Sequence, residues 1–120
     1  MSIRVWKETD IVDTVLPDSL GAPLYQNQAP AERVKVTEIK FTNQIASNVD
    51  VTMHFVKFGE AAVASNAETF TTRAGCVAII PMSTVYEFGV AIFATSDQAD
   101  SVRMKISAKE ELFDPDQGET

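Results

Sequence analysis

Two segments of this chain alternate apolar and polar side chains with a strict period of two. The alternation runs through residues 48–55 and again through residues 101–109. A period of two over such lengths is typical of a β-strand with one buried and one solvated face. We expect the buried faces to consist of Val49, Val51, Met53 and Phe55 on the first segment and of Val102, Met104, Ile106 and Ala108 on the second.

Residues 34–43 alternate with one change of phase. Val34 and Val36 share one parity, whereas Ile39 and Phe41 share the other. One extra residue at position 37 or 38, forming a β-bulge, would place all four side chains on the same face. The segment therefore predicts a bulged strand.

The remaining segments predict further short strands. Residues 76–80 are apolar on both faces, which is typical of a central strand, and Pro81 would end it. Residues 68–72 are a candidate edge strand, and residues 86–94 alternate, with Gly89 as a bulge or a site of close approach. About seven or eight strands separated by turn signals predict an all-β fold, an antiparallel β-sandwich or jelly roll.

The N-terminal segment is less regular. Ile11, Val12, Val15 and Leu16 have helical spacing, and Pro17 would end any helix. We therefore predict an extended N-terminal arm over residues 1–22, with at most one helical turn. The sandwich domain would follow over residues 23–112, and residues 113–120 would form an acidic flexible tail.

The composition argues against several classes of partner. The 120 residues carry a net charge of −7, which disfavours nucleic acid because phosphate binding requires clustered cations. No apolar stretch is long enough for a transmembrane helix, so we expect no membrane partner and synthesis in a reducing cytoplasm. Cys76 is the only cysteine and lies in an apolar run, which predicts a small buried hydrophobe.

The sequence offers little catalytic chemistry. His54 is the only histidine and falls on the polar face of its segment, where a solvated or interface imidazole is expected. Motifs for a serine nucleophile elbow, a phosphate loop, a dinucleotide site or a zinc site are lacking. A weak calcium site at Asp97 and Asp100 remains an alternative. We predict a protein that is not an enzyme and that has no catalytic, cofactor-binding or metal-binding residues.

One row of basic side chains is expected on a solvated face. Arg103, Lys105 and Lys109 share the polar parity of the last strand, and Lys35 and Lys40 could lie on its neighbour. A solvated face is the favoured interpretation, since lysines also protect strand edges from aggregation. A docking stripe for an acidic partner is the alternative.

Aromatic side chains outside the regular pattern are candidates for an interface. Trp6 and Tyr25 lie in or near the arm, and Phe58 and Phe93 break the alternation of their segments. Exposed apolar side chains of this kind often mark a subunit interface.

The order of the segments resembles a known module. Leu24-Tyr25 and Pro30 precede a strand from Val36 to Asn43, and an Ala-Ser turn then leads into Val49–Met53. An Ala-Gly turn, an apolar strand and two final strands complete a pattern over residues 24–111 that resembles β-sandwich modules of bacteriophage virion proteins. The resemblance implies a non-enzymatic virion component, either a capsid decoration (cement) protein or a module of a head or tail fibre. Such modules usually form small symmetric oligomers.

We therefore expect a decoration protein on the outside of a phage head, made in the host cytoplasm. Its partners would be the major capsid protein and further copies of itself, with a trimer favoured over a dimer. The candidate partner-binding residues are Trp6, Ile11, Val15, Leu16, Tyr25 and Phe58. The alternatives are a tail, neck or fibre component and, less favoured, a carbohydrate-binding sandwich that uses Trp6, Tyr25 and Tyr86.

Overall fold

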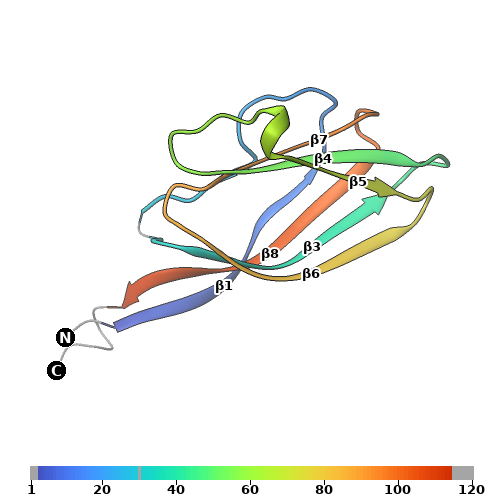
Figure 1. Cartoon of the computed structure of the whole chain (residues 1–120). Helices are drawn as coiled ribbons and strands as arrows, with labels where there is room; N and C mark the ends of the chain where they lie inside the picture. The colour runs from blue at the N-terminus through green and yellow to red at the C-terminus, as the bar shows by residue number, and fades with distance from the viewer. Residues whose placement is uncertain (1–2, 30, 115–120) are drawn as a thin grey trace.

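The chain forms two four-stranded antiparallel sheets that pack face to face in a computed structural model, which describes residues 3–29 and 31–114 (Figure 1). The predicted all-β sandwich is therefore confirmed. The first sheet has the strand order β1-β8-β3-β6 and the second β2-β7-β4-β5. The elements are β1 Ile3–Val15, β2 Tyr25–Gln26, β3 Val34–Asn43, β4 Val49–Val56, the short 3-10 helix η1 Ala64–Asn66, β5 Ala67–Thr72, β6 Val77–Tyr86, β7 Ala91–Ser96 and β8 Val102–Asp114. Within the described ranges, no helix is long and apolar enough to cross a bilayer.

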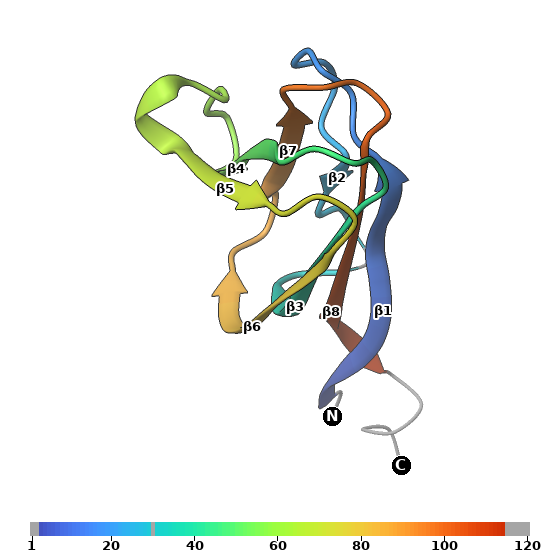
Figure 2. The same cartoon turned by 90° about the vertical axis from the view of Figure 1, so that its right-hand side faces the viewer.

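The strand pairings follow a single rule. β1 pairs with β8, β2 with β7, β3 with β6 and β4 with β5, always antiparallel. The outgoing half of the chain, β1–β4, thus runs beside the returning half, β5–β8, and the resulting double ribbon is wound into two layers (Figure 2). This winding is that of a jelly roll, one of the two predicted architectures.

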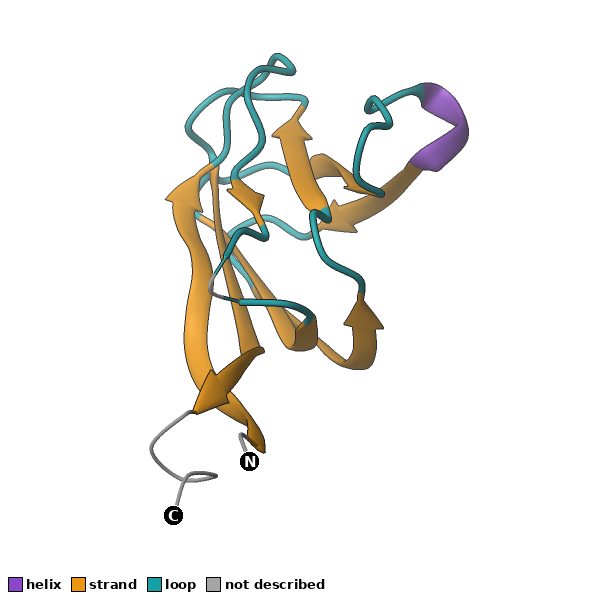
Figure 3. Cartoon of the chain, turned by 90° about the vertical axis from the view of Figure 1, so that its left-hand side faces the viewer, coloured by secondary structure: helices purple, strands orange, loops and turns teal. Residues whose placement is uncertain are grey.

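The two regular segments form central strands that supply much of the core. On β8, the four side chains predicted to face inward are at most 2% exposed. On β4, Val49, Val51 and Met53 are fully buried, and Phe55 is partly buried against the same core. One expectation for β4 is wrong: His54 is only 7% exposed. The short helix η1 lies in the connection between β4 and β5 (Figure 3). Asn66, its last residue, has its side-chain oxygen next to the imidazole of His54.

The predicted bulge in residues 34–43 is present in β3. Its pairing with both β6 and β8 shifts register between Val36 and Glu38. The shift returns Ile39 and Phe41 to the face used by Val34 and Val36, and all four side chains are at most 1% exposed. The Thr37 hydroxyl donates a hydrogen bond of 3.1 Å to the carbonyl of Ser107, so the extra residue is bonded to the neighbouring strand.

The N-terminal segment contains a long edge strand, and the expected helical turn is absent. β1 pairs with β8 along its whole length, with a register shift between Asp10 and Val12. This second bulge explains the helix-like spacing, because it changes the parity of the apolar positions within a strand. Val12 and Leu16 are consequently 4% and 0% exposed.

The strand predicted to be central is an edge strand. β6 lies at the border of the first sheet and continues through Pro81 and Ser83 to Tyr86. Edge strands tolerate proline because one side of the backbone needs no ladder partner. The expected strand over residues 86–94 is divided by a turn, so that its first part belongs to β6 and its second part to β7. β5 lies at the edge of the second sheet, as predicted.

β1 and β8 extend beyond the rest of the first sheet. The pairing of β3 with β8 ends at Glu110, whereas β1 and β8 remain paired out to Ile3 and Asp114. Figure 1 shows this two-stranded extension projecting beyond the sandwich. Residues 113–114 of the predicted tail thus belong to β8, and residues 115–120 lie outside the described part of the chain.

Candidate docking surface

The single histidine has a structural environment. The Nδ1 atom of His54 lies 2.7 Å from the side-chain oxygen of Asn66, which also accepts a hydrogen bond from the backbone of Val63. These contacts fix the loop after β4 against the second sheet. In the described part of the chain, no group of three or more metal-binding side chains comes together.

The basic side chains form two adjacent rows on the outer face of the first sheet, the face turned away from the second sheet. Arg103, Lys105 and Lys109 lie on β8, and their register partners on β3 include Lys40 and Lys35. Lys35 lies directly opposite Lys109, and Lys40 lies directly opposite Lys105. Directly opposed like charges destabilise a sheet, so these rows have an electrostatic cost unless anions compensate them.

Carboxylates of β1 compensate one end of these rows. Asp13 accepts a hydrogen bond of 2.8 Å from Nε of Arg103, and Asp10 lies 3.5 Å from the ammonium group of Lys105. All four side chains are about half exposed. Exposed pairs of this kind contribute about 0–1 kcal/mol each, so they mainly balance the local charge.

An apolar row borders the lysines on the other side. Val77, Ile79 and Val85 of β6 are 53%, 57% and 41% exposed and lie beside Thr42, Lys40 and Lys35 of β3. We call Val77, Ile79 and Val85 the β6 apolar row. The opposite face of β6 packs against the core through Ala78, Ile80, Met82 and Tyr86. The preceding Cys76 is exposed, so its prediction as a buried hydrophobe is wrong.

Two turns present aromatic side chains at the end of this row. In the turns 57–60 and 87–90, the last backbone N–H bonds to the first carbonyl, and Gly59 and Gly89 supply the positive φ angles of 84° and 85°. Phe58 and Phe88 precede these glycines and are 71% and 50% exposed. Type II turns need a positive φ at the third residue, which explains the repeated Phe-Gly pair.

The two turns pack against each other and enclose a pocket. A Cβ atom on Gly89 would lie 2.6 Å from the ring and 2.7 Å from the Cβ atom of Phe58, so only glycine permits this contact. The pocket has a volume of about 400 Å³ and is lined by Phe55, Lys57, Phe58, Val85, Tyr86, Glu87, Phe88 and Val90. Phe55 and Tyr86 stack within it at 4.9 Å. Because Val85 belongs to both features, the aromatic pocket continues the β6 apolar row.

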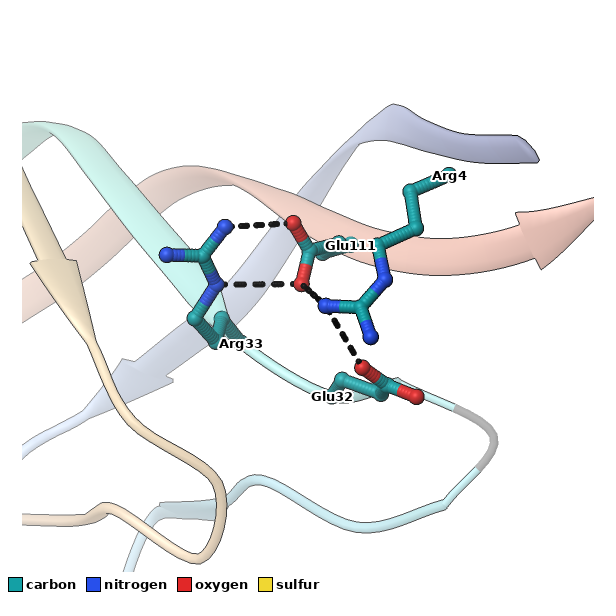
Figure 4. A network of polar contacts seen from close by, with 4 residues as sticks. All are labelled: Arg4, Glu32, Arg33 and Glu111. Carbon is teal, nitrogen blue, oxygen red and sulfur yellow. Dashed lines mark hydrogen bonds and ion pairs between the residues drawn. The ribbon is translucent and has the colours of Figure 1, made fainter.

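A buried carboxylate fixes the base of the β1–β8 extension (Figure 4). Glu111 accepts two hydrogen bonds from Arg33, of 3.0 and 2.6 Å, and Arg4 reaches the same carboxylate at 3.3 Å. Arg4 also lies 3.0 Å from Glu32. The hydrogen bonds from Arg33 lower the pKa of Glu111 more than its burial raises it, and the charges of Arg33 and Arg4 lower it further. The carboxylate therefore stays ionised and ties β1, β8 and the start of β3 together.

The structure separates the residues predicted to bind a partner. Trp6 is 40% exposed on the outer face of the first sheet, with the Arg33 guanidinium 5.5 Å from its ring centroid. Phe58 lies at the aromatic pocket. Ile11 and Val15 are partly buried on β1. Leu16 is fully buried in the core and is therefore not a surface contact, because the bulge in β1 turns it inward.

Tyr25 forms contacts within the chain and is not free to bind a partner through its hydroxyl group. Its hydroxyl donates a hydrogen bond of 2.8 Å to Glu110, and its ring packs against a small core cluster that also contacts Tyr86. Burial raises the pKa of Tyr25 well above its usual range, with a further contribution from Glu110. Trp6, Tyr25 and Tyr86 therefore do not form the shared platform that a carbohydrate-binding interpretation needs.

The sequence reasoning missed the β6 apolar row and Phe88. One signal could have identified the β6 apolar row: a strand with apolar side chains on both faces that also contains Pro81. Proline is confined to sheet edges, and an edge strand with two apolar faces exposes one of them. The rest of the surface depends on which strands become neighbours. Models of known protein families do not match this chain, and neither does any curated protein.

Proposed function

We propose that this protein is a non-catalytic structural component that docks on another protein through the β6 apolar row and the aromatic pocket, as a decoration protein on the outside of a phage head. The observation that carries the proposal is the exposure of Val77, Ile79 and Val85 on one edge strand. Exposed apolar side chains along a free edge strand are typical of protein interfaces and are otherwise an aggregation hazard.

The energy of such docking is modest for one copy. Fully burying a valine or isoleucine stabilises by about 1.5–3 kcal/mol, so covering three half-exposed side chains would contribute roughly 3 kcal/mol before the cost of association. The two phenylalanine rings add to this area. A decoration protein repeats the contact over a symmetric shell, and a symmetric oligomer, such as the favoured trimer, would engage several sites at once. The shell then gains stability by linkage to binding.

Two further points support the virion setting. The segment order resembles that of phage virion modules, and the jelly roll is an architecture used by viral capsid proteins. Lectins and enzymes of the cupin type share that architecture, so the fold alone does not select the function. The docking residues differ from those first expected, because β1 is part of the first sheet and a deletion of residues 1–22 would remove a strand.

The proposal is tested by placing threonine in the β6 apolar row. Val77→Thr, Ile79→Thr and Val85→Thr together keep β-branched side chains, so the strand should still form. Leu20→Thr with Val63→Thr is the control, because both side chains are about half exposed but lie in loops outside β6. Purified heads lacking the protein are incubated with each variant, and bound copies are counted.

We expect the triple variant to lose occupancy and the loop control to bind like the wild type. Hundreds of copies over the head support a decoration protein. A handful at one vertex would indicate a tail or neck component instead, and binding to a glycan array without particle binding would indicate the carbohydrate alternative. Equal occupancy of the triple variant and the control would refute the assignment of the surface.

A further inference from the structure

A small pocket on the outer face of the first sheet holds an uncompensated pair of lysines. Trp6, Lys35, Val85 and Lys109 line it, and its volume is about 200 Å³. Lys35 and Lys109 are direct register partners on β3 and β8, so their side chains leave the same face next to each other. Trp6 forms one wall from β1, and Val85 forms the opposite wall from β6. We call this the lysine pocket.

The same face contains a second opposed pair of lysines, which provides an internal comparison. Lys40 and Lys105 lie at a neighbouring pocket whose lining includes Asp13, and Lys105 is also paired with Asp10. Two carboxylates of β1 thus offset two of the three positive charges there, those of Arg103 and Lys105. Of the residues that the structure describes, none with a carboxylate lines the lysine pocket. The two sites differ in the one component that would neutralise them.

The carboxylate nearest in register does not fill this role. Glu8 is the partner of Lys109 on β1, yet among the described residues neither Lys35 nor Lys109 forms an ion pair. Glu8 instead borders a separate hollow with Thr9 and Asp10. Glu111, the next carboxylate along β8, is held by Arg33 and Arg4. Within residues 3–29 and 31–112, Lys35 and Lys109 thus lack an ion-pair partner, although the chain as a whole carries a net charge of −7.

We propose that the lysine pocket receives a carboxylate side chain of the docking partner, flanked by apolar side chains that cover Trp6 and Val85. This inference rests on the proposed docking function and specifies the chemistry of the partner. A carboxylate between Lys35 and Lys109 relieves the repulsion of the opposed charges and gains charge-assisted hydrogen bonds. Val85 also borders the aromatic pocket, so the same partner segment would continue onto apolar surface.

A nucleic acid fits this surface less well. Glu8, Asp10 and Asp13 form an acidic row on β1 beside the lysines. A polyanion would have to pass this row or the acidic Glu38 on β3, whereas a single carboxylate on a protein surface would not. Charge complementarity therefore favours an isolated carboxylate with apolar neighbours.

The test uses the full chain, and the probe is the peptide N-acetyl-Val-Glu-Val-amide, with N-acetyl-Val-Gln-Val-amide as its uncharged match. Chemical-shift changes are followed by NMR at the backbone amides and at the indole N–H of Trp6. We expect saturable changes at Lys35, Lys109, Val85 and Trp6 with the glutamate peptide. The glutamine peptide should bind with an affinity about tenfold lower than the glutamate peptide, as expected for the loss of a charge-assisted contact.

Two variants extend the test to the particle. Lys35→Gln with Lys109→Gln should weaken peptide and particle binding about tenfold, while its unfolding midpoint stays the same or rises because the opposed charges are gone. Lys7→Gln with Arg73→Gln removes two positive charges from exposed side chains outside the lysine pocket and the aromatic pocket, and this variant should bind like the wild type.

The outcomes separate this inference from the proposed function. Peptide binding at the lysine pocket without particle binding would overturn the proposed docking function, whereas the lysine pocket would still be a carboxylate receptor. Equal binding of both peptides, an unaltered Lys35/Lys109 variant, or tighter binding of a single-stranded oligonucleotide would overturn the pocket as a carboxylate receptor.

Discussion

The contact between Gly89 and Phe58 allows a quantitative test of how the aromatic pocket is built. We consider Gly89→Ala. An alanine at a φ of 85° costs about 1–2 kcal/mol of backbone strain. Its Cβ atom would also lie 2.7 Å from the Cβ atom of Phe58, which no rotation of the Phe58 side chain can relieve. Forcing such an overlap typically costs about 1–3 kcal/mol, so the free energy of unfolding should fall by about 2–5 kcal/mol in total.

The chain supplies its own control for this prediction. Gly59 occupies the equivalent position of its turn with a φ of 84°, yet a Cβ atom there would meet nothing within 4 Å. Gly59→Ala should therefore show only the strain, about 1–2 kcal/mol. Urea unfolding with linear extrapolation gives both values, provided that the m-values agree. The difference between the two variants isolates the contact with Phe58.

A second substitution identifies the contact directly. Phe58→Gly removes both the ring and the Cβ atom that face Gly89. In that background, the effect of Gly89→Ala should decrease to that of Gly59→Ala. Equal costs for Gly89→Ala and Gly59→Ala in the wild-type background would refute the reasoning, because the strain is the same at the two positions and only the contact differs.

Four further predictions concern other parts of the fold. Glu111→Gln should lower the unfolding free energy at neutral pH. Because the pKa of Glu111 is lowered in the fold, its stabilisation is present above the pKa of a free glutamate, about 4.3, and is lost as the pH falls from there through the lowered pKa, so thermal melts of the two proteins should converge in acid. Burial raises the pKa of both tyrosines, Tyr25 and Tyr86, so their ultraviolet titration in the native protein should have its midpoint above pH 10, and the chain should lose stability as they are forced to ionise. Deletion of Thr37 should be tolerated in urea much better than deletion of Lys40, because loss of the bulge residue keeps Val34, Val36, Ile39 and Phe41 on one face, whereas loss of Lys40 puts Ile39 and Phe41 on opposite faces. Cys76 should react with a thiol reagent in the folded protein as fast as in denaturant, whereas a long protection would contradict its exposure.

The parts of the fold that the sequence predicts well are those determined by neighbouring positions along the chain. The alternation of β8 and the bulge of β3 are both visible in one segment, because a buried face must stay continuous whatever strand lies beside it. The phase change between Val36 and Ile39 therefore located the bulge correctly. In β1, a bulge at residues 10–12 produced a helix-like spacing, and only its pairing with β8 distinguishes the two interpretations.

The candidate surface depends on contacts between distant segments. His54 is buried because the β4–β5 connection brings Asn66 to it, and no local pattern encodes that approach. The lysine rows were anticipated, but the lack of an ion pair at Lys35 and Lys109 within the described residues depends on the register of three strands. Register is set by long-range pairing, so it is not visible in the alternation of any single segment.

The misplacement of β6 has a physical cause that bears on function. Apolar side chains on both faces of β6 predict that both faces are covered. They do not by themselves determine whether the strand lies in the centre or at the edge of its sheet. The position is wrong, because β6 lies at the edge and its outer face is exposed. The outer face still needs to be covered, since Val77, Ile79 and Val85 do not stabilise the fold while they are exposed to water on a free edge. In the single chain only one of the two apolar faces of β6 is covered, and a docking partner would cover the other. This argument requires that the threonine variant lose particle binding without losing stability.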